Sequence, residues 1–128
     1  MVSAVIHGGC YKTATSTIQA VAQKNRERFL GTFGVLYPKT GTRANQGVPD
    51  PDSVAHHLLF HAARTAAEQT GAEPKSSFDN LRAKLAAEIQ KSGARRVFVS
   101  TELLSFASET VKAHFLRYFN RPSDEVAI

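Results

Sequence analysis

A segment near the N-terminus combines the residue types that bind phosphate-like anions. Two glycines, Lys12 and several hydroxyl side chains lie within residues 8–17. The apolar run 2–7 before it predicts a short buried strand, and the residues after it predict an amphipathic helix over 16–30. The first N–H groups of a helix lack internal partners, and the helix dipole favours negative charge there. The segment therefore predicts an anion-binding loop between a strand and a helix.

This loop differs from the Walker A loop, which reads G-x-x-x-x-G-K-[ST]. Counting from Gly9, Ala14 stands at the second glycine and Thr15 at the lysine, while the lysine of this chain is earlier, at Lys12. A loop without the usual lysine is poorly suited to hold the γ-phosphate of ATP or GTP. The spacing therefore argues against an ordinary kinase or GTPase.

The stretch Lys12–Thr17 resembles the K-[ST]-[GA]-T-[ST] loop of sulfotransferases. Further pieces are similar to bacterial sulfotransferase-like proteins: His7–Gln19, Asn25-Arg26, and Gly34–Pro38. The resemblance extends over residues 5–128, with alanine at Ala14 and threonine at Thr17 as its two departures. It implies a P-loop-like site for 3′-phosphoadenosine 5′-phosphosulfate (PAPS), without a metal. The residues that it implies for the 5′-phosphosulfate are Gly9, Cys10, Tyr11, Lys12, Thr13, Ala14, Thr15, Ser16 and Thr17.

The resemblance also implies the roles of two catalytic groups. Lys12 would neutralise charge on the leaving oxygens, and Glu102 falls where cytosolic sulfotransferases carry the histidine that removes the acceptor's proton. The alternative for Glu102 is a helix cap or a lysine partner. His56, or its neighbour His57, is the second candidate for the base. His57 and His61 have the spacing of two zinc ligands, but no third ligand accompanies them, so no metal site is predicted.

Apolar runs and turn residues alternate in a way that predicts an α/β domain over residues 1–128. We expect a parallel sheet in a three-layer α/β/α arrangement, of the P-loop NTPase-like type that the resemblance implies. In such sheets the carboxyl ends of the strands share one edge, where ligands bind. The expected strands are 2–7, 35–37, 96–100 and 125–128, and the expected helices after residue 30 are 52–69, 76–93 and 108–119.

The end of the chain affects the functional interpretation. In the family resembled here, an Arg and a Ser that follow the fourth strand hold the 3′-phosphate of PAPS. That strand is expected here over 125–128, so neither residue is assigned before the sequence ends at Ile128. We therefore expect the N-terminal part of a sulfotransferase-like domain, truncated at its C-terminus. The alternative is a non-catalytic nucleotide- or anion-binding module with a degenerate P-loop.

The amino-acid composition limits the classes of ligand and the cellular location that we expect. The net charge of +5 favours anionic ligands, although the basic residues are scattered and match no nucleic-acid recognition motif. No stretch reaches the ~18 consecutive apolar residues of a membrane span. A single cysteine and no secretory signal favour a cytoplasmic protein. The expected acceptor is a small molecule or a carbohydrate; its identity and the oligomeric state do not follow from the sequence.

Overall fold

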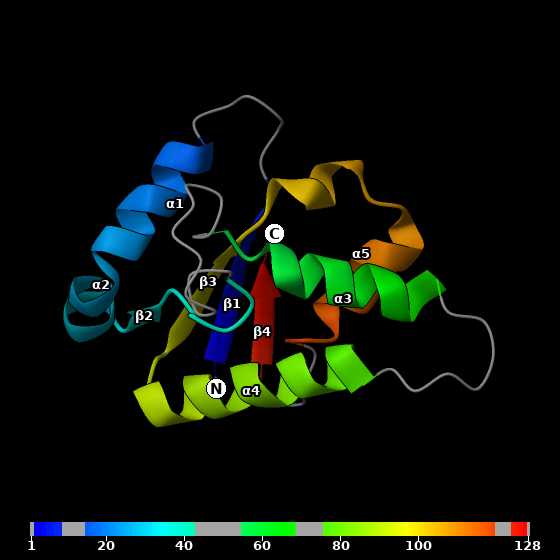
Figure 1. The fold of residues 1–128 in the computed structure, drawn as a ribbon. Helices are drawn as coiled ribbons and strands as arrows, with labels where there is room; N and C mark the ends of the chain where they lie inside the picture. The colour runs from blue at the N-terminus through cyan, green and yellow to red at the C-terminus, as the bar shows by residue number, and fades with distance from the viewer. Residues whose placement is uncertain (1, 9–14, 43–54, 69–75, 120–123, 128) are drawn as a thin grey trace.

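Four parallel strands form the centre of the molecule (Figure 1). The computed structural model describes residues 2–8, 15–42, 55–68, 76–119 and 124–127. The strands lie in the order β2-β3-β1-β4, and each neighbouring pair is parallel. The predicted α/β class with a parallel sheet is therefore confirmed. The bounds are β1 (Val2–His7), β2 (Val35–Leu36), β3 (Arg96–Ser100) and β4 (Asp124–Ala127).

Helices flank this sheet on two sides. In Figure 1, α1 and α2 lie to the left of the strands, α3 and α5 lie to the right, and α4 runs beneath. None of the described helices is long and apolar enough to cross a membrane. The helices are α1 (Thr15–Lys24), α2 (Arg26–Phe33), α3 (His57–Glu68), α4 (Ser76–Ser92), the 3₁₀ helix η3 (Glu102–Phe106) and α5 (Glu109–Leu116).

Side chains alternate across the two faces of the sheet, as strand geometry requires. Ala4 and Ile6 of β1 point to the same face as Val97 and Val99 of β3, and all four are buried in the main core. Residues of α3, α4 and α5 complete this core. The helices contribute Leu59, Phe60, Ala62, Ala63 and Ala66 from α3, Phe78 and Leu85 from α4, and Val111 and Phe115 from α5.

The opposite face carries Val5, His7, Phe98 and Ser100, which are paired in the register of β1 and β3. Helices α1 and α2 cover this face in part, and Val5 remains 40% exposed. An apolar groove of about 400 Å³ lies between the two helices and the sheet. Its lining is Ile18, Val21, Ala22, Phe29, Phe33, Val35 and Phe98.

The single helix expected over 16–30 is wrong, because the chain forms two helices that meet at Asn25. Asn25 has φ −106° and ψ 18°, outside helical geometry. Its side-chain Nδ2 donates to Val21 O at 2.8 Å, the same carbonyl that its backbone N–H reaches at 3.0 Å. Asparagine often competes with the backbone in this way. Gly34 then ends α2 in the left-handed conformation, with φ 66°.

The four expected strands and the helices expected over 76–93 and 108–119 are confirmed with small shifts of their bounds. Helix α4 ends at Ser92, followed by Gly93 with φ 69°. Its apolar stripe packs on the core and consists of Phe78, Leu81, Leu85 and Ile89. Helix α5 is capped by Ser108, whose hydroxyl accepts from Val111 N. The start expected at residue 52 for the next helix is wrong, because Ala55 and His56 are not helical and α3 begins at His57. Helix η3, directly after β3, was not predicted.

Gly41 allows the loop after β2 to pack tightly on α3. Its φ is 89°, and a Cβ there would overlap Leu59 Cγ in the core. Gly93 is a matched control, because it has φ 69° and no atom within 4 Å of the added Cβ. We predict that Gly93→Ala lowers the free energy of unfolding by about 1 kcal/mol and Gly41→Ala by about 2–4 kcal/mol. Urea denaturation measures both, and equal losses would refute the close packing at Gly41.

Candidate functional site

The carboxyl ends of β1 and β3 lie side by side. His7 pairs with Ser100 in the sheet register, and Thr101 N donates to His7 O at 3.0 Å. The convergence of these two strand ends, expected from parallel topology, is confirmed. Gly8, directly after β1, and Thr101-Glu102, directly after β3, therefore leave the sheet at one edge.

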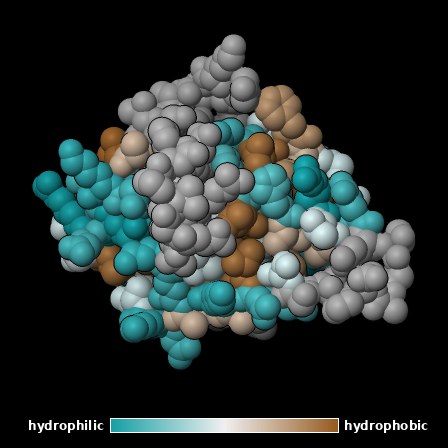
Figure 2. All heavy atoms as spheres, in the orientation of Figure 1, coloured by the Kyte–Doolittle hydropathy of each residue, from teal (hydrophilic) through white to brown (hydrophobic). Residues whose placement is uncertain are grey.

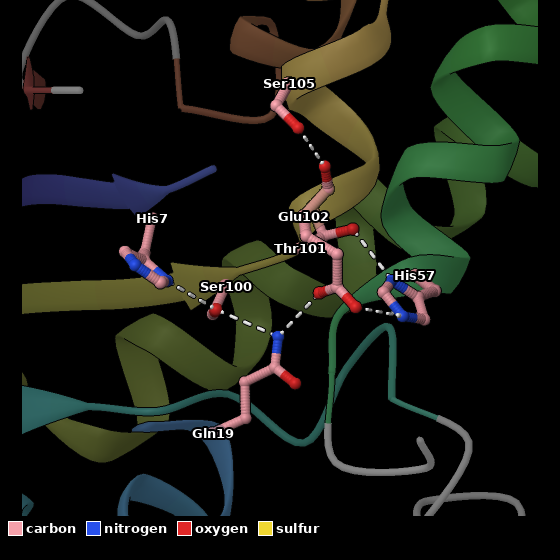
Figure 3. Close-up of polar contacts among 7 residues, drawn as sticks. All are labelled: His7, Gln19, His57, Ser100, Thr101, Glu102 and Ser105. Atoms are coloured by element: carbon pink, nitrogen blue, oxygen red, sulfur yellow. Dashed lines mark hydrogen bonds and ion pairs between the residues drawn. The ribbon is translucent and has the colours of Figure 1, made fainter. Parts of the chain in front are cut away.

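A buried hydrogen-bond cluster forms around the Ser100 hydroxyl at this edge (Figure 3). His7 Nδ1 lies 3.0 Å from Ser100 Oγ, and Gln19 Nε2 donates to the same oxygen at 3.0 Å. Ser100 is fully buried and Gln19 is 2% exposed. The first turns of α1 are therefore attached to the ends of β1 and β3.

The Glu102 carboxylate lies between α1 and α3 (Figure 3). Gln19 Nε2 also donates to Glu102 Oε2 at 3.0 Å, so one side-chain amide joins Ser100 and Glu102. On the other side, His57 Nε2 lies 3.7 Å from Glu102 Oε1. The side chains of His57 and Glu102 are 16% and 21% exposed. These two groups are therefore both oriented by the protein and accessible to a ligand.

The backbone after β3 and the start of α3 determine where these two groups point. Glu102 opens helix η3, and Ser105 Oγ donates to Glu102 O at 2.7 Å, which closes the turn. His57 Nδ1 lies 2.8 Å from Thr101 Oγ1, and Thr101 is fully buried. Each ring nitrogen of His57 thus faces one of two successive residues of the β3 end.

His56, the second candidate for the base, lies in the interior with no exposed surface. Its Nδ1 accepts from Ser100 N at 3.0 Å, and its Nε2 lies 2.8 Å from Pro38 O. With Nδ1 as acceptor, the proton is on Nε2 and donates to the Pro38 carbonyl. Burial lowers the pKa of His56 to about 4, so its ring is neutral at pH 7. Both ring nitrogens are therefore used in structural hydrogen bonds.

Tyr37 connects two segments on which the resemblance rests, Asn25-Arg26 and Gly34–Pro38, to His56. Its ring centroid lies 4.5 Å from that of His56 and 5.8 Å from that of Phe98. Arg26 Nε donates to Tyr37 O at 2.7 Å, and the guanidinium lies 5.6 Å from the ring centroid. Burial raises the pKa of the Tyr37 phenol well above its usual range, so the phenol stays neutral. The Asn25-Arg26 and Gly34–Pro38 segments thus form one contact network with His56.

The central loop residues of the predicted anion site, Gly9, Cys10, Tyr11, Lys12, Thr13 and Ala14, lie outside the described residues. The residues on either side are described. Gly8 leaves β1 beside η3, where a Cβ would lie 3.8 Å from Leu104 Cβ. Thr15, Ser16 and Thr17 open α1. Because Gln19 of α1 contacts Glu102, the loop leaves and rejoins the described structure next to this carboxylate.

Sequence reasoning missed Gln19 and Ser100 as members of this cluster. A glutamine on the inner face of a helix that follows an anion-binding loop is a usable signal, because buried polar groups need partners. Its partner could not be named before the fold was known. His57 was considered beside His56, and the geometry favours His57 as the group that reaches Glu102.

Among the described residues, no three His, Cys, Asp or Glu side chains are grouped so that they could hold a metal ion. Comparison with protein families, curated proteins and solved structures finds no match to this chain. The functional interpretation therefore depends on the cluster itself and on the loop beside it.

The buried His56 predicts how stability changes with pH. Its pKa is about 4 in the folded chain and about 6.5 in the unfolded chain, so between these values the unfolded chain binds the extra proton. We predict that the His56 contribution to the unfolding free energy is constant above about pH 7. On acidification it falls by up to about 3 kcal/mol as the pH approaches 4.

Urea denaturation at a series of pH values measures this loss, and His56→Gln should reduce it. A second measurement does not depend on how the variant folds. In the native protein, the NMR signals of the His56 ring should stay constant between pH 7.5 and 5.5. A titration midpoint near 6.5 for this ring would contradict its buried, neutral state.

Proposed function

We propose that this chain is a sulfotransferase-like domain that transfers a sulfuryl group from PAPS to a hydroxyl or amine acceptor. The observation that carries the proposal is the Glu102 carboxylate, which is oriented by Gln19 and partly exposed beside the ends of the 9–14 loop. The β1–loop–α1 unit next to a parallel β3 supports it, because anions bind at helix N-termini on this edge of a parallel sheet. A P-loop NTPase-like fold, a three-layer arrangement and a cytoplasmic location belong to the same proposal.

Glu102 would act as the general base. A carboxylate can accept the acceptor's proton as the oxygen or nitrogen attacks sulfur, provided that it lies within hydrogen-bond reach. The new bond forms to sulfur, and the bond between sulfur and the 5′-phosphate oxygen breaks. Lys12 would neutralise the charge that develops on that leaving oxygen. PAPS supplies the sulfuryl group, and the acceptor is a small molecule or a carbohydrate.

Gln19 and His57 would position this base and do not themselves exchange protons with the substrate. The Gln19 amide donates to Glu102 Oε2, which leaves Oε1 on the side of His57. His57 Nε2 lies 3.7 Å from Glu102 Oε1, which is longer than a hydrogen bond, so Oε1 is the carboxylate oxygen that would accept the proton.

Nucleotide binding is the first test of the proposal. We predict that adenosine 3′,5′-bisphosphate, the product that remains after transfer, binds to the chain in isothermal titration calorimetry. Lys12→Ala should weaken this binding, while Lys84→Ala, an exposed substitution on α4, should leave it unchanged. Binding of magnesium–ATP in preference to the bisphosphate would instead favour phosphoryl transfer.

Measurements of sulfuryl-transfer turnover test whether Glu102 is the general base. We predict that Glu102→Gln lowers turnover by about 100-fold or more, with PAPS affinity nearly unchanged. Glu109→Gln is the control, because Glu109 is 94% exposed at the start of α5 and should leave turnover unchanged. Near-normal turnover in Glu102→Gln would remove Glu102 as the base. Bisphosphate binding without any transfer by the unsubstituted chain would favour the non-catalytic module.

A further inference from the structure

A large pocket with many charged residues in its lining is found at the β2 edge of the sheet, away from the carboxyl ends of β1 and β3. Its volume is about 980 Å³, at the upper end of the range for small-molecule sites. The walls are residues 23–28 and Leu30 from the α1–α2 junction, Leu36, Lys39 and Thr40 from β2 and the loop after it, and Ala87, Glu88, Lys91 and Ser92 from α4. Figure 2 shows hydrophilic side chains gathered over the α2 and α4 side of the molecule.

The pocket has a strong excess of positive charge. Five of its residues are cations: Lys24, Arg26, Arg28, Lys39 and Lys91. In the described part of the chain, none of these five has a carboxylate oxygen within 4.0 Å of its charged group. Arg26 also has a buried donor, Nη2, without a hydrogen-bond acceptor among the described residues. Glu88 interacts electrostatically with Arg26, but cations outnumber carboxylates in the lining, and an excess of like charge in one cavity favours binding of an anion.

The two acidic residues of the pocket do not balance this charge. Both oxygens of Glu88 are occupied by the loop after β2: Oε2 accepts from Lys39 N at 2.8 Å, and Oε1 accepts from Thr40 N at 2.9 Å and Thr40 Oγ1 at 2.7 Å. Glu88 thus holds the wall of the pocket in place. Glu27 is exposed on α2. The net formal charge of the lining, five cations against two carboxylates, is +3.

The uncharged lining indicates what else the ligand carries. Gln23 Oε1 is a buried acceptor without a hydrogen-bond donor among the described residues, so it can accept from a ligand hydroxyl group. The apolar members of the lining are aliphatic. The described lining contains no aromatic ring on which a nucleobase could stack. An extended ligand with several hydroxyl groups and separated negative charges fits this lining.

The pocket is separate from the N-terminus of α1. Gln23 lies eight residues beyond the start of α1 at Thr15, which corresponds to roughly 12 Å along the helix axis. The pocket also faces the outer edge of the sheet, because β2 is the terminal strand in the order β2-β3-β1-β4. A ligand bound there would not occupy the position of one bound at the N-terminus of α1.

We propose that this pocket binds an acidic carbohydrate, a sugar chain that carries carboxylate groups. The cations contact the carboxylates, and the neutral side chains of the α1–α2 junction and α4 contact the hydroxyl groups. This binding is independent of the function proposed above, because it requires neither Lys12 nor Glu102.

The experiment compares two oligosaccharides of equal length by calorimetry at low ionic strength. The probe is a hyaluronan tetrasaccharide, and the neutral control is the tetrasaccharide of N-acetylglucosamine. We predict that the acidic probe binds and the neutral one does not. Lys39→Gln combined with Lys91→Gln should weaken binding about tenfold, since two exposed ion pairs are lost. The matched control, Lys84→Gln with Arg117→Gln, removes the same charge from exposed positions outside the pocket and should have no effect.

Adenosine 3′,5′-bisphosphate serves as a competitor in the same titrations and should not displace the tetrasaccharide. Displacement would overturn the proposal by assigning the pocket to the nucleotide. Three further results would overturn the proposal: equal binding of both oligosaccharides, equal weakening of binding by both double variants, or no binding of the acidic probe. If the bisphosphate fails to bind at all while the tetrasaccharide binds as predicted, the sulfotransferase proposal fails and this one stands.

Discussion

The structure depends on the way His56 holds the end of β3. The His56 backbone N–H donates to Ser100 O, while its ring accepts from Ser100 N and faces Pro38 O. One buried residue thus satisfies both backbone groups of Ser100 and a carbonyl of the loop after β2. Leaving such groups unpaired in the interior would cost about 1–3 kcal/mol each. This constraint fixes three segments that are far apart in the sequence.

The position of His57 follows directly from this constraint. Because His56 is held in the interior, the next residue begins α3 at the same edge, where its ring meets Thr101 and Glu102. Gln19 approaches the same carboxylate from α1. The candidate site is therefore assembled from α1, β3, η3 and α3, and none of these elements could form it alone.

The two faces of the sheet have different roles. Along β3, Val97 and Val99 pack into a dry core with α3, α4 and α5, whereas Phe98 and Ser100 face α1 and α2. At the carboxyl end of this second face, Gln19 and His7 satisfy the Ser100 hydroxyl. The apolar packing of Val97 and Val99 stabilises the sheet on one face, while the buried Ser100 hydroxyl on the other face needs these polar partners.

Much of the fold could be predicted because many of its helices and strands are specified by residues that are close together in the sequence. The apolar stripe of α4, the Ser108 cap of α5 and the apolar strand 96–100 each depend on residues close together in the sequence. The break at Asn25 was not predicted, because asparagine is tolerated within helices and its competing hydrogen bond to Val21 O is visible only in three dimensions. The predicted base Glu102 lies at the expected edge of the sheet, but its partners were found only in the structure.

The amino-acid order by itself determined the strand–loop–helix unit, the alternation that produces a parallel sheet, and hence the edge at which Gly8 and Glu102 leave their strands. These features follow from periodicity and turn chemistry over a few residues. Only the tertiary structure decided that His56 is buried and neutral while His57 faces Glu102, since two adjacent histidines look alike in sequence. It also decided that cations from the α1–α2 junction, the β2 loop and α4 share one pocket. The reason is physical: burial, charge environment and hydrogen-bond partners are set by segments that are distant along the chain.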